Sequence, residues 1–251
     1  HIMSSAALIW PTIAVVPFEC TDGNDAAHIH GEACTDEVVA RLVRVPQLHV
    51  VSTMSTRALR ARAMQAQAIC GHLGATYVIA GRYRLASDRL ELFFELTDGR
   101  NGALVWADRL GHSLRSPRDA WAHIGATVTE QVLAALLKNE LDRTAGQSLH
   151  TIEAYSLFFA AMSLMHRATA RDFERARAML EELAWRHNRS AVGHAWLAKW
   201  HVLRVVQGWS QDPATEGVKA LDCTRRALDA NSNDALALAI CGLVHGYLRK
   251  D

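Results

Sequence analysis

The sequence lacks the long apolar runs and the excess charge of one sign that would assign it to a membrane or to a nucleic acid. Its longest apolar run, Ala235–Val244, is shorter than the about 18–20 residues that span a bilayer. The 251 residues include 27 Lys and Arg against 26 Asp and Glu, which leaves a formal net charge of +1. This balance gives no electrostatic reason to expect nucleic acid as a direct ligand. We therefore expect this segment neither to span a membrane nor to contact nucleic acid directly.

The sequence also lacks the local patterns that carry catalysis. Gly71–Gly74 contains two glycines but follows a helical stretch, whereas a phosphate-binding loop opens a helix. Ser52–Ser55 has no nucleophile-elbow context, and no pair of carboxylates or set of Ser, His and Asp stands out. We therefore expect no catalytic residue and no cofactor in this segment.

Cysteine is scarce and unpaired in the sequence. The five cysteines are odd in number and form no Cys-x-x-Cys motif. Cys70, Cys223 and Cys241 lie in apolar helical stretches, where a free thiol packs as a small hydrophobic group. Free thiols favour a reducing compartment, and the N-terminus shows no secretory signal pattern. We therefore expect the cytoplasm, or the periplasm if a membrane span precedes this segment.

The first half of the sequence alternates strand patterns with helical patterns. Thr12–Phe18 is a β-branched run typical of a buried strand, and Leu48–Ser52 is expected to be a second strand. Glu19–Gly31 is expected to be a loop, after which Thr35 caps a helix with an acidic first turn. The order of elements predicts a mixed α/β sheet covered by helices. The further expected elements are a helix over 56–73 with Gly74 directly after its end, strands over 77–85, 89–97 and 104–110, and a helix over 116–141 with Pro117 at its first position. Along 89–97 every second residue is apolar, which predicts one mainly apolar face.

Three blocks of this half resemble the TolB N-terminal-like domain of bacterial signalling regulators: Thr12–Phe18, Leu73–Gly81 and Leu104–Arg109. The resemblance extends over residues 12–141, and we place the domain at residues 4–145 after a cloning remnant at residues 1–3. It implies an α/β fold and a position C-terminal to an effector domain. That effector would be a winged-helix DNA-binding domain or a class III adenylate cyclase. The resemblance supplies no catalytic residues.

Residues 146–251 are expected to form helix pairs without strands. Small residues such as Ala160, Ala176 and Ala220 recur where paired helices would touch, and the spacing resembles tetratricopeptide (TPR) repeats of about 34 residues. The pattern predicts two complete TPR-like units and the opening helix of a third, with a long inter-helix loop over Gln207–Glu216. We expect the array to be truncated at Asp251, or its exposed end to be covered by a partner chain.

Four of the seven tryptophans fall in this helical half. Trp196 and Trp200 are one helical turn apart and therefore share a face. One interpretation is an aromatic patch of Trp196, Trp200 and Trp209 that binds a peptide or a partner helix. The other interpretation is core packing between helices, which is favoured because helices of such arrays routinely bury large side chains.

The most metal-like cluster in the sequence comprises His28, His30 and Cys34, which could supply imidazole and thiolate ligands. Their spacing matches no zinc module, so the favoured interpretation is an exposed loop with incidental histidines. Asp22–Asp25 lacks the alternating oxygen ligands of a calcium loop and is expected to be a turn.

Together these patterns predict a non-catalytic regulatory or sensory module of a bacterial signalling regulator, with a winged-helix transcriptional regulator favoured. One alternative is the regulatory region of a class III adenylate cyclase. Another is an α/β domain that binds a small ligand at its strand ends, with repeats that dimerise. The expected partner is a protein or peptide bound by the helical repeats, or a second copy of the chain.

Overall fold

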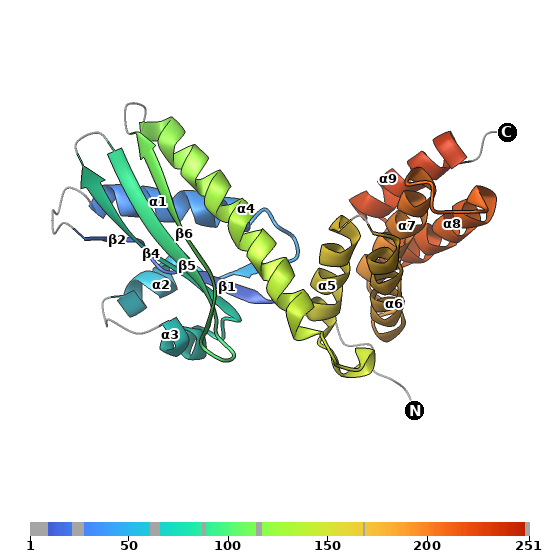
Figure 1. The fold of residues 1–251 in the computed structure, drawn as a ribbon, viewed down its shortest axis with the longest axis horizontal. Helices are drawn as coiled ribbons and strands as arrows, with labels where there is room; N and C mark the ends of the chain where they lie inside the picture. The colour runs from blue at the N-terminus through green and yellow to red at the C-terminus, as the bar shows by residue number, and fades with distance from the viewer. Residues whose placement is uncertain are drawn as a thin grey trace. The chain divides into compact units, whose positions relative to one another are not determined.

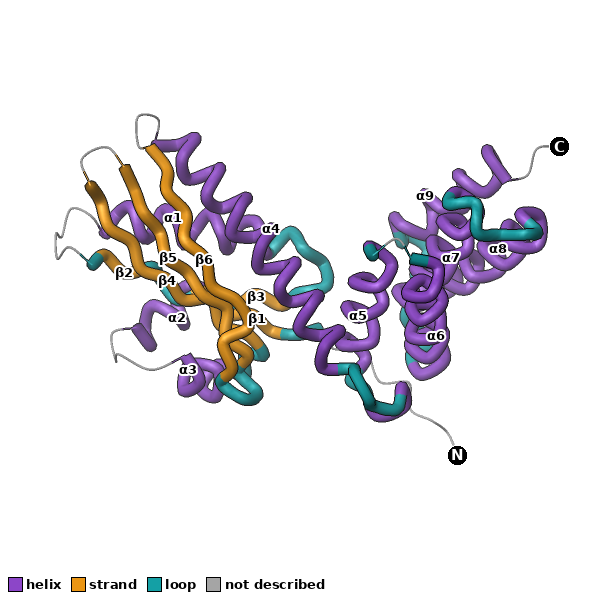
Figure 2. Tube along the Cα trace, in the orientation of Figure 1, coloured by secondary structure: helices purple, strands orange, loops and turns teal. Residues whose placement is uncertain are grey.

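The computed structural model describes residues 10–21, 28–60, 66–86, 89–113, 117–167 and 169–248. Contacts divide the chain into an α/β unit, Trp10–Leu136, and a helical unit that runs from Leu137. The division falls inside helix α4 (Pro117–Arg143), whereas the sequence analysis places the domain boundary after this helix, between residues 145 and 146. Figure 2 shows the described strands in the first unit and helices throughout the second. No helix in these ranges is both long and apolar enough to cross a membrane.

The α/β unit is a mixed sheet with helices packed on it, as expected (Figure 1). Strand β1 runs parallel to its neighbours β3 and β4, while β4, β5 and β6 are antiparallel in sequence order. Strand β2 also pairs with β4, beyond the end of β1. The strands are β1 (Thr12–Val15), β2 (Glu19–Cys20), β3 (His49–Val50), β4 (Tyr77–Ala86), β5 (Arg89–Asp98) and β6 (Ala103–Ser113), and the helices before α4 are α1 (His28–Leu42), α2 (Thr53–Arg60) and α3 (Ala66–Leu73).

One face of the sheet is buried by α1 and α4. The ring of Tyr83 on β4 lies against Gly31 of α1, and the Arg41 guanidinium of α1 donates to the Ala122 carbonyl of α4 at 3.0 Å. Alternate residues of β5 belong to this face and have no exposed surface, which confirms the alternation read from the sequence. These residues are Leu90, Leu92, Phe94 and Leu96.

The opposite face of the sheet is covered by α3 at the end where β4 begins. Ile69 and Cys70 of α3 form a buried cluster with Ala14 of β1 and Val78 of β4. Further along β4 and β5 the alternate side chains on this face are more exposed, including that of Arg82. This face is therefore covered by α3 where β4 begins and is more exposed toward the other end of β4.

Helix α1 begins at His28, so the prediction that Thr35 caps it was wrong. Thr35 lies inside the helix, where its hydroxyl donates to the Gly31 carbonyl at 2.7 Å and accepts from the Phe18 amide at 3.1 Å. A Cβ on Gly31 would approach the Phe18 carbonyl oxygen and the Tyr83 ring to 2.5 Å. The glycine that made this segment resemble a loop is therefore required by close packing of α1 on the sheet.

Other differences from the expected elements are local. Of the helix expected over 56–73, the structure describes α2 and α3, and residues 61–65 lie outside the described ranges. The segment expected to be a loop contains β2. Gly74 has φ 60° directly after α3, which confirms its predicted role at the end of that helix. Strand β1 ends at Val15 and β3 contains only His49 and Val50, so both strands are shorter than expected.

The helical unit is a series of helices, α5 to α9, in which each helix contacts the next one in sequence. Side-chain oxygens of Thr169, Ser190, Asp212 and Asp234 cap four of the helices. The loop expected over 207–216 is shorter, because Pro213 begins α8. After η2 (Leu149–Thr151) the helices are α5 (Ala154–His166), α6 (Ala170–Arg186), α7 (Ala191–Val206), α8 (Pro213–Ala230), α9 (Ala235–Leu243) and η3 (Val244–Leu248).

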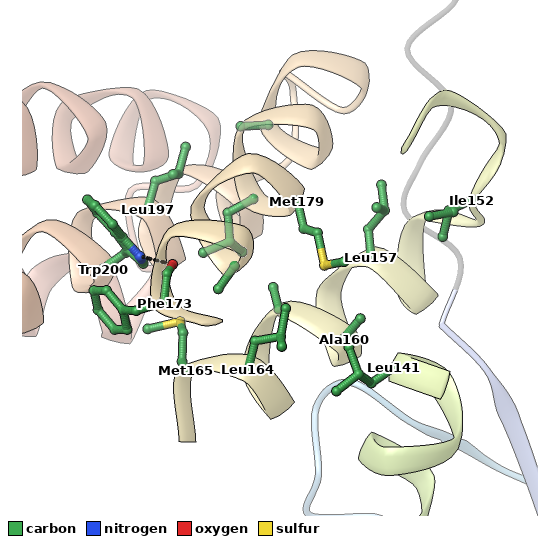
Figure 3. Close-up of a cluster of buried hydrophobic side chains, with 14 residues drawn as sticks. Leu141, Ile152, Leu157, Ala160, Leu164, Met165, Phe173, Met179, Leu197 and Trp200 are labelled. Atoms are coloured by element: carbon green, nitrogen blue, oxygen red, sulfur yellow. Dashed lines mark hydrogen bonds between the residues drawn. The ribbon is translucent and has the colours of Figure 1, made fainter. Parts of the chain in front are cut away.

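The core of the helical unit is built around α5, α6 and α7 (Figure 3). Trp200 of α7 is fully buried in it, and its indole N–H donates to the Phe173 carbonyl of α6 at 2.8 Å. Leu141, from the last turns of α4, belongs to the same cluster as Leu157 and Ala160 of α5. These contacts explain why the compact units divide within α4 rather than after it.

Candidate functional site

The three tryptophans assigned to partner binding occupy different environments. Trp200 is inaccessible, and its ring stacks on Phe173 with centroids 5.0 Å apart and planes 21° apart. Trp209 is partly buried and meets Phe173 edge-on at 5.1 Å, so these two tryptophans share one packing partner. Trp196 is partly buried and lies edge-on to Phe158 at 5.4 Å. In this conformation Trp200 can only support a binding surface from beneath, while Trp196 and Trp209 retain exposed edges.

Trp185, the fourth tryptophan of the helical half, is 62% exposed. It lines a hollow of about 1140 Å³ formed by residues of α6, α7 and α8. An exposed tryptophan beside a hollow is a common anchor for protein partners, because it buries a large area with little loss of side-chain entropy. The lining residues are Glu181, Ala184, Trp185, Arg186, Asn188, Arg189, His194, Leu197, Asp222, Cys223, Arg226, Asp229 and Ala230.

The titratable groups in this hollow suit binding rather than covalent chemistry. Burial raises the pKa of the Cys223 thiol to about 11, so the thiol is protonated and weakly nucleophilic near neutral pH. Burial also lowers the pKa of His194, with the positive charge of Arg226 acting in the same direction. The rim carries three arginines and three carboxylates, so charge alone selects no particular partner.

The cluster of His28, His30 and Cys34 lies on α1 and not in a loop, so the favoured interpretation of an exposed loop was wrong. Cys34 has no exposed surface, and burial raises the pKa of its thiol to about 12, far from that of a ready metal ligand. His30 packs against Trp121 of α4 with ring centroids 5.2 Å apart. Within the described ranges no group of three His, Cys, Asp or Glu side chains is arranged to hold a metal ion. The His28 side chain and Asp22–Asp25 lie outside the described residues.

A second surface, which the sequence analysis missed, lies on the sheet of the α/β unit. Strand pairing places Arg82 of β4 opposite Phe93 of β5, and Phe93 opposite Arg109 of β6. Each of these residues belongs to a strand that was expected from the sequence, but only the register brings them into one row. No local motif marks the row, since its members are 11 or more residues apart in the chain.

Comparison with known families gives a match to a regulator domain. Residues 10–122 match the family described as HilA/YgeH-like transcriptional regulator, second domain. A curated relative of Rhizobium meliloti (strain 1021), "Putative adenylate cyclase 3", is 23% identical over 240 residues. That alignment covers 96% of this chain and 41% of the relative, so the chain spans about two fifths of the relative's length. Both matches agree with the expected regulatory signalling context.

Solved structures resemble parts of this chain at low identity. TolB from Acinetobacter baumannii is 20% identical with a TM-score of 0.39, over 53% of this chain and 30% of TolB. Lipoprotein GNA1162 from Neisseria meningitidis is 16% identical with a TM-score of 0.35, over 48% of this chain and 93% of the lipoprotein. The LpoB C-terminal domain from Salmonella enterica is 15% identical with a TM-score of 0.31, over 43% of this chain and 85% of that domain. TM-scores of this size carry no inference about ligands or partners.

Proposed function

We propose that this chain is a non-catalytic regulatory module of a bacterial transcriptional regulator and that its effector is a winged-helix DNA-binding domain in the same polypeptide. The observation that carries the proposal is the match of residues 10–122 to the second domain of HilA/YgeH-like transcriptional regulators. In this proposal the module acts in the cytoplasm and contacts DNA only through the effector domain.

The helical unit is proposed to bind the protein partner. In this proposal its helices form TPR-like pairs, α5 with α6 and α7 with α8, and α9 is the first helix of a third pair. The hollow beside Trp185 supports this assignment, because a large exposed aromatic ring is adjacent to a recess that could receive a partner side chain or helix. Trp196 and Trp209 do not line this hollow and are proposed as further partner contacts through their exposed edges, with Trp200 packed in the core.

The alternative, which the curated relative supports, is that this chain is the regulatory region of a class III adenylate cyclase. The relative named as an adenylate cyclase aligns with 96% of this chain, so the two-unit arrangement as a whole also occurs in that setting. Sequence identity of 23% does not transfer an activity to this chain, and the same regulatory module would serve either effector.

The two settings are separated by assaying the intact natural polypeptide that contains this segment. The transcriptional proposal predicts that the intact protein retards promoter DNA in a gel-shift assay, that the 251-residue segment alone does not, and that neither forms cyclic AMP from ATP. Cyclic AMP formation by the intact protein would instead assign the module to a cyclase. An intact protein with neither activity would contradict both assignments.

A further inference from the structure

The end of the sheet that α3 leaves uncovered carries a cross-strand row of three side chains. Arg82, Phe93 and Arg109 lie directly opposite one another on β4, β5 and β6. Directly opposite residues in paired strands point to the same face of the sheet. Tyr83 and Leu92, their neighbours in the chain, are buried against the helices on the other face, so the row points away from α1 and α4. Both arginines are exposed and Phe93 is half-buried.

Neither arginine of this row forms an ion pair with a carboxylate of the described residues. In the adjacent row Arg84 pairs with Glu91 at 2.7 Å, and this hydrogen bond is the main reason that the pKa of Glu91 is lowered. For Arg82 and Arg109, by contrast, the described part of the chain places no carboxylate within the 4.0 Å of an ion pair. Three carboxylates face this region from other rows: Glu19, opposite Arg82 on β2, and Glu91 and Glu95 on β5. The charge of Arg109 also contributes to the lowered pKa of Glu91.

Phe93 holds one of these charges in place. The Arg82 guanidinium lies 4.9 Å from the centre of the Phe93 ring, a cation–π arrangement that orders the long side chain and leaves its N–H edges available. A preordered guanidinium loses less conformational entropy when it binds an anion than a free side chain does. The row is thus a phenyl platform with a guanidinium on each flanking strand.

Two hollows adjoin the row and share Arg82 and Phe93 in their walls. One, of about 270 Å³, extends over the apolar side chains of Val16, Pro17 and Ile69. The other, of about 230 Å³, reaches Arg109 and is also lined by Arg84 and Glu91, which pair with each other. Each has the size for a small molecule rather than for a folded partner. Together their walls include apolar side chains, the arginines and the carboxylates Glu19, Glu91 and Glu95.

We propose that this face binds a small organic molecule with two acidic groups, carboxylate or phosphate, one held by Arg82 and the other by Arg109. Guanidinium groups form paired N–H···O hydrogen bonds with either kind of acid. The two arginines are two strand spacings apart, roughly 10 Å between backbones, so the acidic groups are separated by a carbon spine that lies on Phe93. The site goes beyond the proposed function, because it belongs to the α/β unit and needs no effector domain.

The test is isothermal titration calorimetry of the 251-residue chain with defined probes. Adipate and suberate present two carboxylates on apolar spines, fructose 1,6-bisphosphate presents two phosphates, and hexanoate presents one carboxylate. Arg82→Gln and Arg109→Gln remove one charge each and leave a shorter, neutral polar side chain. The matched control is Arg225→Gln on α8, where an exposed arginine pairs with Asp222. Circular dichroism of each variant establishes that it is folded.

The proposal predicts that at least one two-acid probe binds and that each sheet variant weakens it by about tenfold or more, the usual cost of losing a hydrogen bond to a charged group. Arg225→Gln should leave the affinity unchanged, and hexanoate should bind more weakly than adipate. Binding of adipate or suberate would identify the acidic groups as carboxylates, and binding of fructose 1,6-bisphosphate would identify them as phosphates. Equal affinity for hexanoate and adipate, an equal loss in the control, or no binding of any two-acid probe would overturn the proposal. Polyglutamate is titrated as a further probe, and its binding in the absence of binding by any two-acid probe would overturn the proposal in favour of an acidic protein segment. Each of these results is independent of whether the effector is a DNA-binding domain or a cyclase.

Discussion

His201 Nδ1 of α7 lies 2.5 Å from Glu216 Oε2 of α8, and both side chains are more than nine-tenths buried. Glu216 also faces the Arg204 guanidinium, which lies 3.6 Å from its second carboxyl oxygen. Arg204 in turn reaches Glu174 of α6 at 3.4 Å, so three helices are joined by one chain of polar contacts. Such a network is costly to break, because removal of one member leaves another buried group without its partner.

The first prediction concerns acid sensitivity. Burial lowers the pKa of His201, and the nearby charges of Arg177 and Lys219 act in the same direction, while Glu216 opposes them. Between the lowered pKa of His201 in the folded chain and the ordinary histidine pKa near 6.5, the unfolded chain binds more protons than the folded chain. Stability is therefore fully present above about pH 6.5 and decreases as the pH falls toward the lowered pKa. Melting curves followed by circular dichroism from pH 7.5 to pH 5 should show this loss.

The variant His201→Gln should flatten that dependence, although it will lower stability at neutral pH. His166→Gln serves as its control, because His166 is exposed at the end of α5. Identical pH dependence in the wild type and His201→Gln would show that the acid sensitivity comes from other groups, of which His194, with its lowered pKa, is the first to examine.

The second prediction separates packing from recognition among the tryptophans. Trp200→Ala should destabilise the helical unit by about 3–5 kcal/mol, since it opens a large cavity and leaves the Phe173 carbonyl without its donor. Trp185→Ala should change stability by less than about 0.5 kcal/mol, since this side chain is mostly in solvent. Urea unfolding of both variants measures the difference, and comparable losses would contradict the packing described for Trp200.

The third prediction concerns partner binding by the hollow. If the effector domain is the protein partner that the hollow binds, Trp185→Ala should weaken its capture by the 251-residue chain by about tenfold or more, the effect expected for an anchoring aromatic residue. Val206→Ala is the control, because Val206 is 68% exposed on α7 and does not line the hollow. If both variants bind the effector as the wild type does, the hollow is not the docking surface.

The fourth prediction tests the close approach of α1 to the sheet. Alanine is a better helix former than glycine, so propensity alone predicts that Gly31→Ala is stabilising. The added Cβ would however approach the Phe18 carbonyl and the Tyr83 ring to 2.5 Å, and we expect a net loss of about 1–3 kcal/mol. Gly71→Ala on α3, where a Cβ meets nothing within 4 Å, should be neutral or slightly stabilising. A gain in stability for Gly31→Ala in thermal unfolding would show that the helix can move to accept the methyl group.

Local pattern was sufficient for most of the secondary structure. The alternation along β5, the helix over α4 that begins at Pro117, and the left-handed Gly74 after α3 were all predicted from neighbouring residues. Each depends on interactions within a few positions of the chain, namely side-chain periodicity, capping and backbone freedom. The order of strands and helices followed from these, and with it the mixed sheet and the helical unit.

The sequence by itself therefore determined which elements form and in what order, because those depend on short-range physics. Only the tertiary structure decided that Gly31 belongs to a helix, that Trp200 is in the core while Trp185 is exposed, and that Arg82, Phe93 and Arg109 form one row. These outcomes depend on which distant segments pack together and in what register. A shift of one residue between β4 and β5 would place Phe93 on the opposite face of the sheet from Arg82 and break up the row, and no local pattern records that choice.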